Sequence, residues 1–119
     1  MSSYSRQLLS GSTNGLPIPV AATASPGTTI HTAVTGTTGQ FDEIYMWASN
    51  VTANPATLTV QFGGTTDPTN DLVYQFSIPA NSPPIPIATG QVLQNALVVK
   101  AWSGTASAIN ISGFVNRIS

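Results

Sequence analysis

The chain has 119 residues, a formal net charge of −1 and no cysteine. This length fits one domain with a core of its own, and the lack of cysteine excludes a disulfide framework, a thiolate nucleophile and a cysteine zinc site. Charged residues make up only 6% of the chain, against about 25% in an average globular domain, and three scattered cations argue against nucleic-acid binding.

Residues 1–27 are predicted to form an extended N-terminal arm. A short strand fits the first ten residues, but the turn residues at 11–15 end it, and Pro17 and Pro19 exclude a regular central strand. Two interpretations stay open: the arm packs on its own domain, or it lies on a neighbouring subunit by strand addition. In the second case the partner-binding residues are Tyr4, Arg6, Leu8, Leu9, Leu16, Ile18 and Val20.

Residues 28–119 are predicted to form a single domain of short strands. Period-two patterns or apolar runs bounded by turn residues occur at 28–34, 44–48, 58–62, 72–78, 85–87, 97–102 and 109–116. The 16 threonines suit half-exposed strands because their branched side chains are stiff. No window shows helical periodicity. The fold class is therefore all-β: an antiparallel β-sandwich or jelly roll with an extended N-terminal arm.

The alternation within these strands also predicts the core. We expect Leu58, Val60 and Phe62 to meet the inner faces of the later strands, and Thr59 to lie on the solvated face. The expected contacts of these three side chains are Leu72, Tyr74, Phe76, Ile78, Val99, Ile109 and Ile111.

Few residues could carry catalysis. His31 is the single histidine, so a two-histidine metal site cannot form within one chain, and we interpret it as a structural or exposed imidazole. Asp42 and Glu43 are adjacent in a predicted strand and so point to opposite faces; we interpret both as solvated edge charges. Asp67 and Asp71 fit a polar turn better than a calcium loop. We predict no enzyme activity, no catalytic or metal residues and no cofactor.

Three aromatic residues leave one question open. Tyr45, Trp47 and Trp102 either pack in the core or form a surface platform that stacks on a sugar or anchors a partner. No run reaches the roughly 20 apolar residues of a membrane helix, and no signal-peptide core is present. We therefore expect a soluble protein that is made in the cytoplasm and has no membrane partner.

Three stretches resemble a known class of proteins: Met46–Asn50, Leu58–Thr66 and Ile111–Ile118. They resemble small virion proteins of tailed bacteriophages, in particular the capsid decoration, or cement, proteins of phage heads. The resemblance implies a structural protein that binds the outer capsid surface as a homotrimer, contacts the major capsid protein and stabilises the shell. The alternative is a jelly-roll domain of a tail or fibre that binds a carbohydrate or a receptor.

Overall fold

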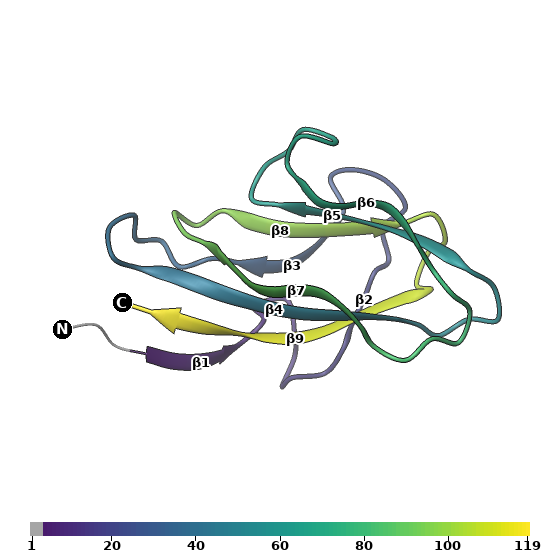
Figure 1. Ribbon diagram of the computed structural model, residues 1–119, viewed down its shortest axis with the longest axis horizontal. Helices are drawn as coiled ribbons and strands as arrows, with labels where there is room; N and C mark the ends of the chain where they lie inside the picture. The colour runs from purple at the N-terminus through teal and green to yellow at the C-terminus, as the bar shows by residue number, and fades with distance from the viewer. Residues whose placement is uncertain (1–3) are drawn as a thin grey trace.

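The computed structural model describes residues 4–119, which form nine β-strands and no helix. Proline, glycine and small polar residues separate the strands, as their turn propensities predict. Figure 1 shows the strands running roughly along the long axis of the molecule. The strands are β1 (Tyr4–Leu8), β2 (Ile18–Pro19), β3 (Thr28–Thr32), β4 (Phe41–Asn50), β5 (Ala56–Phe62), β6 (Asp71–Ile78), β7 (Ile85–Leu93), β8 (Val98–Ser103) and β9 (Ile109–Ile118).

The strands form two antiparallel sheets packed face to face (Figure 1). Sheet A has the order β1-β9-β4-β7, and the short strand β2 also pairs with β9. Sheet B has the order β3-β8-β5-β6. The predicted antiparallel β-sandwich is confirmed, whereas the more specific jelly-roll topology stays a prediction.

The pairing of β4 with β9 is the longest in sheet A and joins ten residues of each strand. In β4, buried and half-buried residues alternate strictly, so Ile44, Met46 and Ala48 point into the core. Opposite Met46, β9 carries Gly113 with φ +154°. A Cβ at Gly113 would collide with the backbone of Tyr45, so only glycine lets the two strands keep this close approach.

Apolar side chains from both sheets fill the space between them. The prediction is correct for six core residues: Leu58, Val60, Ile78, Val99, Ile109 and Ile111 are all fully buried. Phe62 and Leu72 are only partly buried against this core. The remaining large buried side chains are Leu9, Ile18, Val20, Ile30, Ile44, Met46 and Val115.

The prediction is wrong for Tyr74 and Phe76 in strand β6. Tyr74 and Phe76 are 51% and 46% exposed, because β6 is the edge strand of sheet B and no strand of sheet A covers this part of it. Thr59 is buried instead of solvated, and its hydroxyl accepts a hydrogen bond from the backbone N–H of Gln75. A register shift between β5 and β6 falls at this point, and Gln75 has φ +50°. Such an irregularity interrupts the period-two pattern on which the prediction depended.

Residues 4–27 are joined to the sandwich by pairing and packing. Strand β1 pairs with β9 along its whole length, and the backbone N–H of Gly11 donates to the carbonyl of Ile30. Leu9, Ile18 and Val20 are core residues, so their prediction as partner-binding side chains is wrong. They are buried because the segment after β1 passes over the open side of the sandwich. The expected division at residue 27 therefore does not separate two packing units.

These burials predict opposite effects for two truncations. Leu58→Ala should lower the free energy of unfolding by about 3 kcal/mol, because it leaves a cavity in the core. Phe76→Ala should cost less than about 1.5 kcal/mol, because nearly half of the ring is already in water. Urea denaturation of the two variants and the parent protein measures both values. A larger loss for Phe76→Ala than for Leu58→Ala would contradict the observed register.

Candidate functional site

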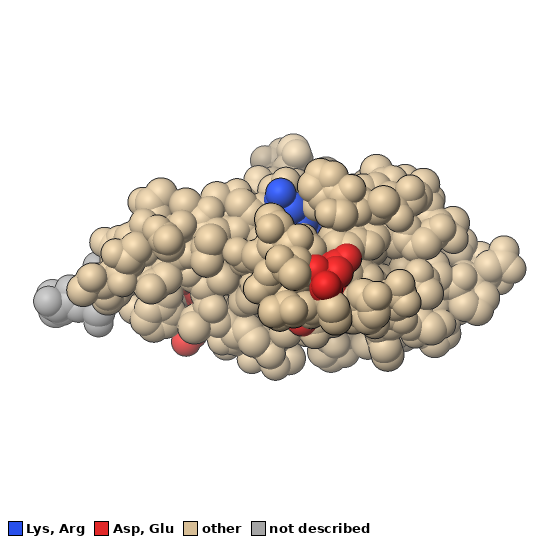
Figure 2. Space-filling view, turned by 90° about the horizontal axis from the view of Figure 1, so that it is seen from above, with Lys and Arg blue, Asp and Glu red and all other residues tan. Residues whose placement is uncertain are grey.

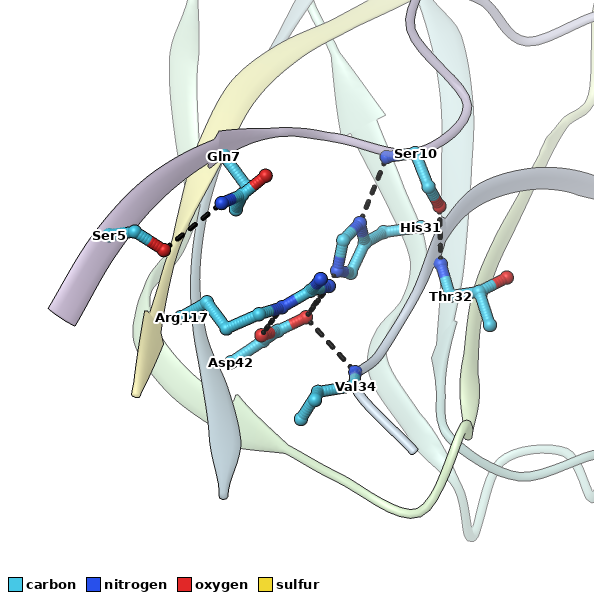
Figure 3. A network of polar contacts seen from close by, with 8 residues as sticks. All are labelled: Ser5, Gln7, Ser10, His31, Thr32, Val34, Asp42 and Arg117. Carbon is cyan, nitrogen blue, oxygen red and sulfur yellow. Dashed lines mark hydrogen bonds and ion pairs between the residues drawn. The ribbon is translucent and has the colours of Figure 1, made fainter. Parts of the chain in front are cut away.

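A buried polar network holds most of the chemistry that could be catalytic (Figure 3). Its centre is the fully buried carboxylate of Asp42 in β4. Oδ2 accepts hydrogen bonds from His31 Nε2 at 2.7 Å and from the backbone N–H of Val34 at 3.2 Å. Arg117 of β9 donates through Nε to Oδ1 at 2.8 Å and through Nη2 to Oδ2 at 3.0 Å. The carboxylate thus binds groups from both sheets.

The protonation of His31 follows from its two neighbours. The backbone N–H of Ser10 donates to Nδ1 at 2.9 Å, so Nδ1 is an acceptor and the proton lies on Nε2, which faces Asp42. Burial lowers the pKa of His31 below its ordinary value, although the Asp42 carboxylate acts to raise it. His31 is therefore a neutral imidazole with both nitrogens occupied.

The charge of Asp42 is maintained by its hydrogen bonds. Burial alone would raise the pKa of this carboxyl, but the hydrogen bonds from Arg117 and His31 outweigh burial and hold the pKa below its ordinary value. With four donors around it, the ionised carboxylate has no free lone pair directed at a cavity. The network can hold the sheets together, but it offers neither a free base nor a nucleophile to a substrate.

The interpretation of Asp42 as a solvated edge charge is wrong. It has the same parity as Ile44, Met46 and Ala48, so the alternation that placed those residues inside also places Asp42 inside. A charge is tolerated there because Arg117, 75 positions later in the chain, donates hydrogen bonds to the carboxylate. The interpretation of His31 as a structural imidazole agrees with its burial.

Removing the central carboxylate should destabilise the fold strongly. Asp42→Asn leaves Arg117 and His31 without their acceptor, and the loss of one partner of a buried ion pair costs about 3 to 5 kcal/mol. Glu43→Gln is the matched control, because the neighbouring side chain points to the outer face and makes no ion pair within the described residues. It should change the free energy of unfolding by less than about 0.5 kcal/mol. Chemical denaturation compares the two, and equal effects would contradict this role of Asp42.

Two acids lie close together at the start of β6: Asp71 is its first residue, and Asp67 is in the loop before it. The pKa of Asp71 is raised to about 6 by burial and by the neighbouring acid Asp67. Both carboxylate oxygens of Asp71 are buried without a donor, while Gln61 Nε2 donates to Asp67 Oδ1 at 2.9 Å. Within residues 4–119 no third acid, histidine or cysteine joins them to form a metal-binding cluster. With its pKa raised to about 6, Asp71 takes up a proton below about pH 6 in the folded chain.

These shifts predict a particular dependence of stability on pH. The folded-state pKa of His31 is below 6.5, so near this pH the unfolded chain binds a proton at His31 that the folded chain does not bind. The free energy of unfolding therefore falls as the pH drops below about 6.5. Asp71 acts in the opposite direction between about 4 and 6, because its raised pKa lets the folded chain bind the extra proton. In Asp71→Asn the loss of stability between pH 7 and 5 should therefore be steeper than in the parent protein.

Thermal unfolding at a series of pH values measures both slopes. Adding His31→Gln to Asp71→Asn should flatten the curve between pH 7 and 5, since neither group then titrates there. Below about pH 4 the protonation of Asp42 should remove further stability. An unchanged slope in Asp71→Asn would contradict the assigned direction for that residue.

The outer face of sheet A carries side chains in rows that cross the strands. One row is Arg6, Asn116 and Glu43, on β1, β9 and β4. Its neighbours along the strands are the row Tyr4, Ile118 and Phe41 and the row Leu8, Phe114 and Tyr45. We call these nine residues the three-row face. Tyr4 and Leu8 are 65% and 53% exposed, which is unusual for side chains of this size.

Aromatic rings on this face pack on one another and not flat against the sheet. The rings of Tyr45 and Phe114 are stacked with centroids 5.1 Å apart, and Trp47 lies 6.1 Å from Phe114. The guanidinium of Arg6 lies 4.6 Å from the centroid of Phe114. Trp102 is in β8 of the other sheet. Tyr45, Trp47 and Trp102 therefore cannot form one platform, which removes the feature that favoured a sugar-binding site.

An apolar groove opens where the free edges of the two sheets approach each other. It has a volume of about 340 Å³. We call it the β6–β7 groove, and it is lined by Leu72, Val73, Tyr74, Phe76, Ile85, Pro86 and Ile87. No charged side chain lines it, and both β6 and β7 end their sheets with an unpaired backbone edge. Figure 2, which views one face of the molecule, shows charged residues only in small, separate areas.

No family model, curated protein or solved structure matches this chain. Among the described residues there is no helix long and apolar enough to cross a membrane. The three-row face and the β6–β7 groove are accessible to a partner, whereas His31 and Asp42 of the polar network are buried.

Proposed function

We propose that the protein is a structural component of a tailed-phage virion, a capsid decoration protein that binds the major capsid protein on the outer surface of the head and stabilises the shell. The observation that carries the proposal is the β6–β7 groove, an uncovered apolar surface beside two free strand edges. The resemblance of three sequence stretches to decoration proteins supplies the identity of the partner.

The groove has the features that an extended segment of a partner requires. Unpaired N–H and C=O groups along β6 can accept a further strand, and the adjoining apolar side chains can bury alternate residues of that strand. Tyr74 and Phe76 line it with half-exposed rings, which are the residue types that most often dominate binding energy. The bound segment would be a part of the capsid protein.

A mechanical role agrees with the chemistry that the chain offers. His31, Asp42 and Arg117 are committed to one another inside the fold. A clamp needs no reacting group: it binds adjacent shell subunits, so that lifting one of them requires breaking its contacts with the clamp. Because no charged side chain lines the groove, its binding should depend on apolar burial and vary little with salt.

Polar substitutions in the groove test the proposal. Tyr74→Ser and Phe76→Ser should each weaken binding to heads of the phage that encodes the protein by at least about tenfold, because each removes a ring at the centre of the contact. Val51→Ser is the matched control, since Val51 is exposed to a similar degree but lies outside the groove. Co-sedimentation with heads measures binding, and thermal unfolding verifies that each variant is folded.

Two outcomes would contradict the proposal. One is that the parent protein fails to sediment with heads at any concentration tested. The other is that Val51→Ser weakens binding as much as the two groove variants do, which would show that the effect is not specific to the groove.

A further inference from the structure

We infer that the three-row face is a contact surface for a second copy of this chain, with the two copies related by a two-fold axis that runs along β9. The inference uses a surface other than the β6–β7 groove and does not depend on capsid binding. The partner is identified as a second copy by the arrangement of charges and side-chain types on either side of β9.

The two charges of the face lie symmetrically about its central strand. Arg6 and Glu43 both pair in register with Asn116, one from β1 and one from β4. Neighbouring strands are about 4.8 Å apart, so the Cα atoms of Arg6 and Glu43 stand at equal distances on opposite sides of Asn116. The guanidinium of Arg6 leans over the ring of Phe114 and has to turn toward the second copy to reach a carboxylate. Neither Arg6 nor Glu43 makes an ion pair within the described residues. A two-fold rotation about β9 exchanges these positions and brings Arg6 of each copy opposite Glu43 of the other.

The two flanking rows obey the same symmetry. Rotation about β9 places Tyr4 opposite Phe41 of the second copy, which is a contact between two aromatic rings. It also places Leu8 opposite Tyr45 of the second copy, which is an apolar contact. All three rows are thus complementary to themselves under one operation. A two-fold axis across the strands, along the middle row, would instead set Arg6 against Arg6 and Glu43 against Glu43 of the second copy and place the like charges together.

The two charged side chains beside the axis can reach across the contact, because both are long and can turn toward the second copy. Asn116 on the axis is only 5% exposed and its Oδ1 is buried, so it adds no contact of its own.

The inferred contact is small. Three strands over the three rows cover roughly 250 Å² of each copy in plan, which is below the size of a stable interface and fits a weak, transient contact. We therefore expect a pair that forms at micromolar or higher concentrations and weakens with added salt, because two ion pairs contribute to it. The homotrimer that the resemblance implies would need a different, head-to-tail contact.

A charge exchange tests the arrangement. Sedimentation equilibrium over a range of protein concentrations should show one and two copies of the parent protein. Arg6→Glu and Glu43→Arg should each weaken pairing by at least about tenfold, because each sets like charges against each other twice. The double variant should restore pairing to within a few fold of the parent protein. Lys100→Glu, which changes a charge in sheet B, should have no effect.

The outcomes separate cleanly. Restoration in the double variant, with loss in both single variants, supports the two-fold arrangement. A parent protein that stays monomeric at hundreds of micromolar, a mass of three copies, or a double variant as weak as the single ones overturns it. Should Arg6→Glu fail to fold, Leu8→Lys takes its place, since Leu8 is exposed on the same face and should weaken pairing similarly. Head binding measured in parallel reports on the proposed function separately.

Discussion

The buried carboxylate of Asp42 is the interaction on which the rest of the structure depends. A charge at that depth is tolerable only while donors surround it, and the donors come from distant parts of the chain: Arg117 from β9, His31 from β3 and the backbone of Val34. Ser10 fixes the imidazole in turn. One charged group therefore ties both sheets and the N-terminal segment together at one end of the sandwich. Asp42, Arg117 and His31 are a large share of the ionisable groups in a chain with so few charges.

Because these charged groups are paired within the fold, few charges remain on the surface. Asp42 is removed from the surface, and the charge of the partly exposed Arg117 is paired with it, so the exterior is made mainly of threonine, serine, asparagine and half-exposed apolar side chains. Such a surface provides little electrostatic repulsion between molecules. Free strand edges on this surface invite pairing with other chains. The same composition leaves apolar side chains and strand edges exposed, to which other chains can bind.

The sequence predicts the strands and the sandwich well, because turn residues and period-two patterns are local signals. It fails where the outcome depends on distant parts of the chain. The alternation in β6 correctly places Phe76 on the same face as Leu58, but it cannot show that no strand of sheet A covers the end of that face. Parity alone would have placed Asp42 inside, yet its acceptance there depends on Arg117, which only the pairing of β4 with β9 brings near. The three-row face depends on the register of three strands, and a single sequence does not fix that register.

The two proposed surfaces are compatible in geometry, and together they explain how weak contacts can brace a shell. An axis along β9 overlaps β1, β9 and β4 with the second copy, so β7 and the β6–β7 groove remain outside the contact. A pair then presents two grooves related by the two-fold axis. Once one groove holds a capsid segment, the other is confined near the shell, where its effective concentration can reach millimolar. Linked binding of this kind can exceed the affinity of either groove by about 10² to 10⁴. Neither contact therefore needs to be strong alone for the proposed bracing of a shell.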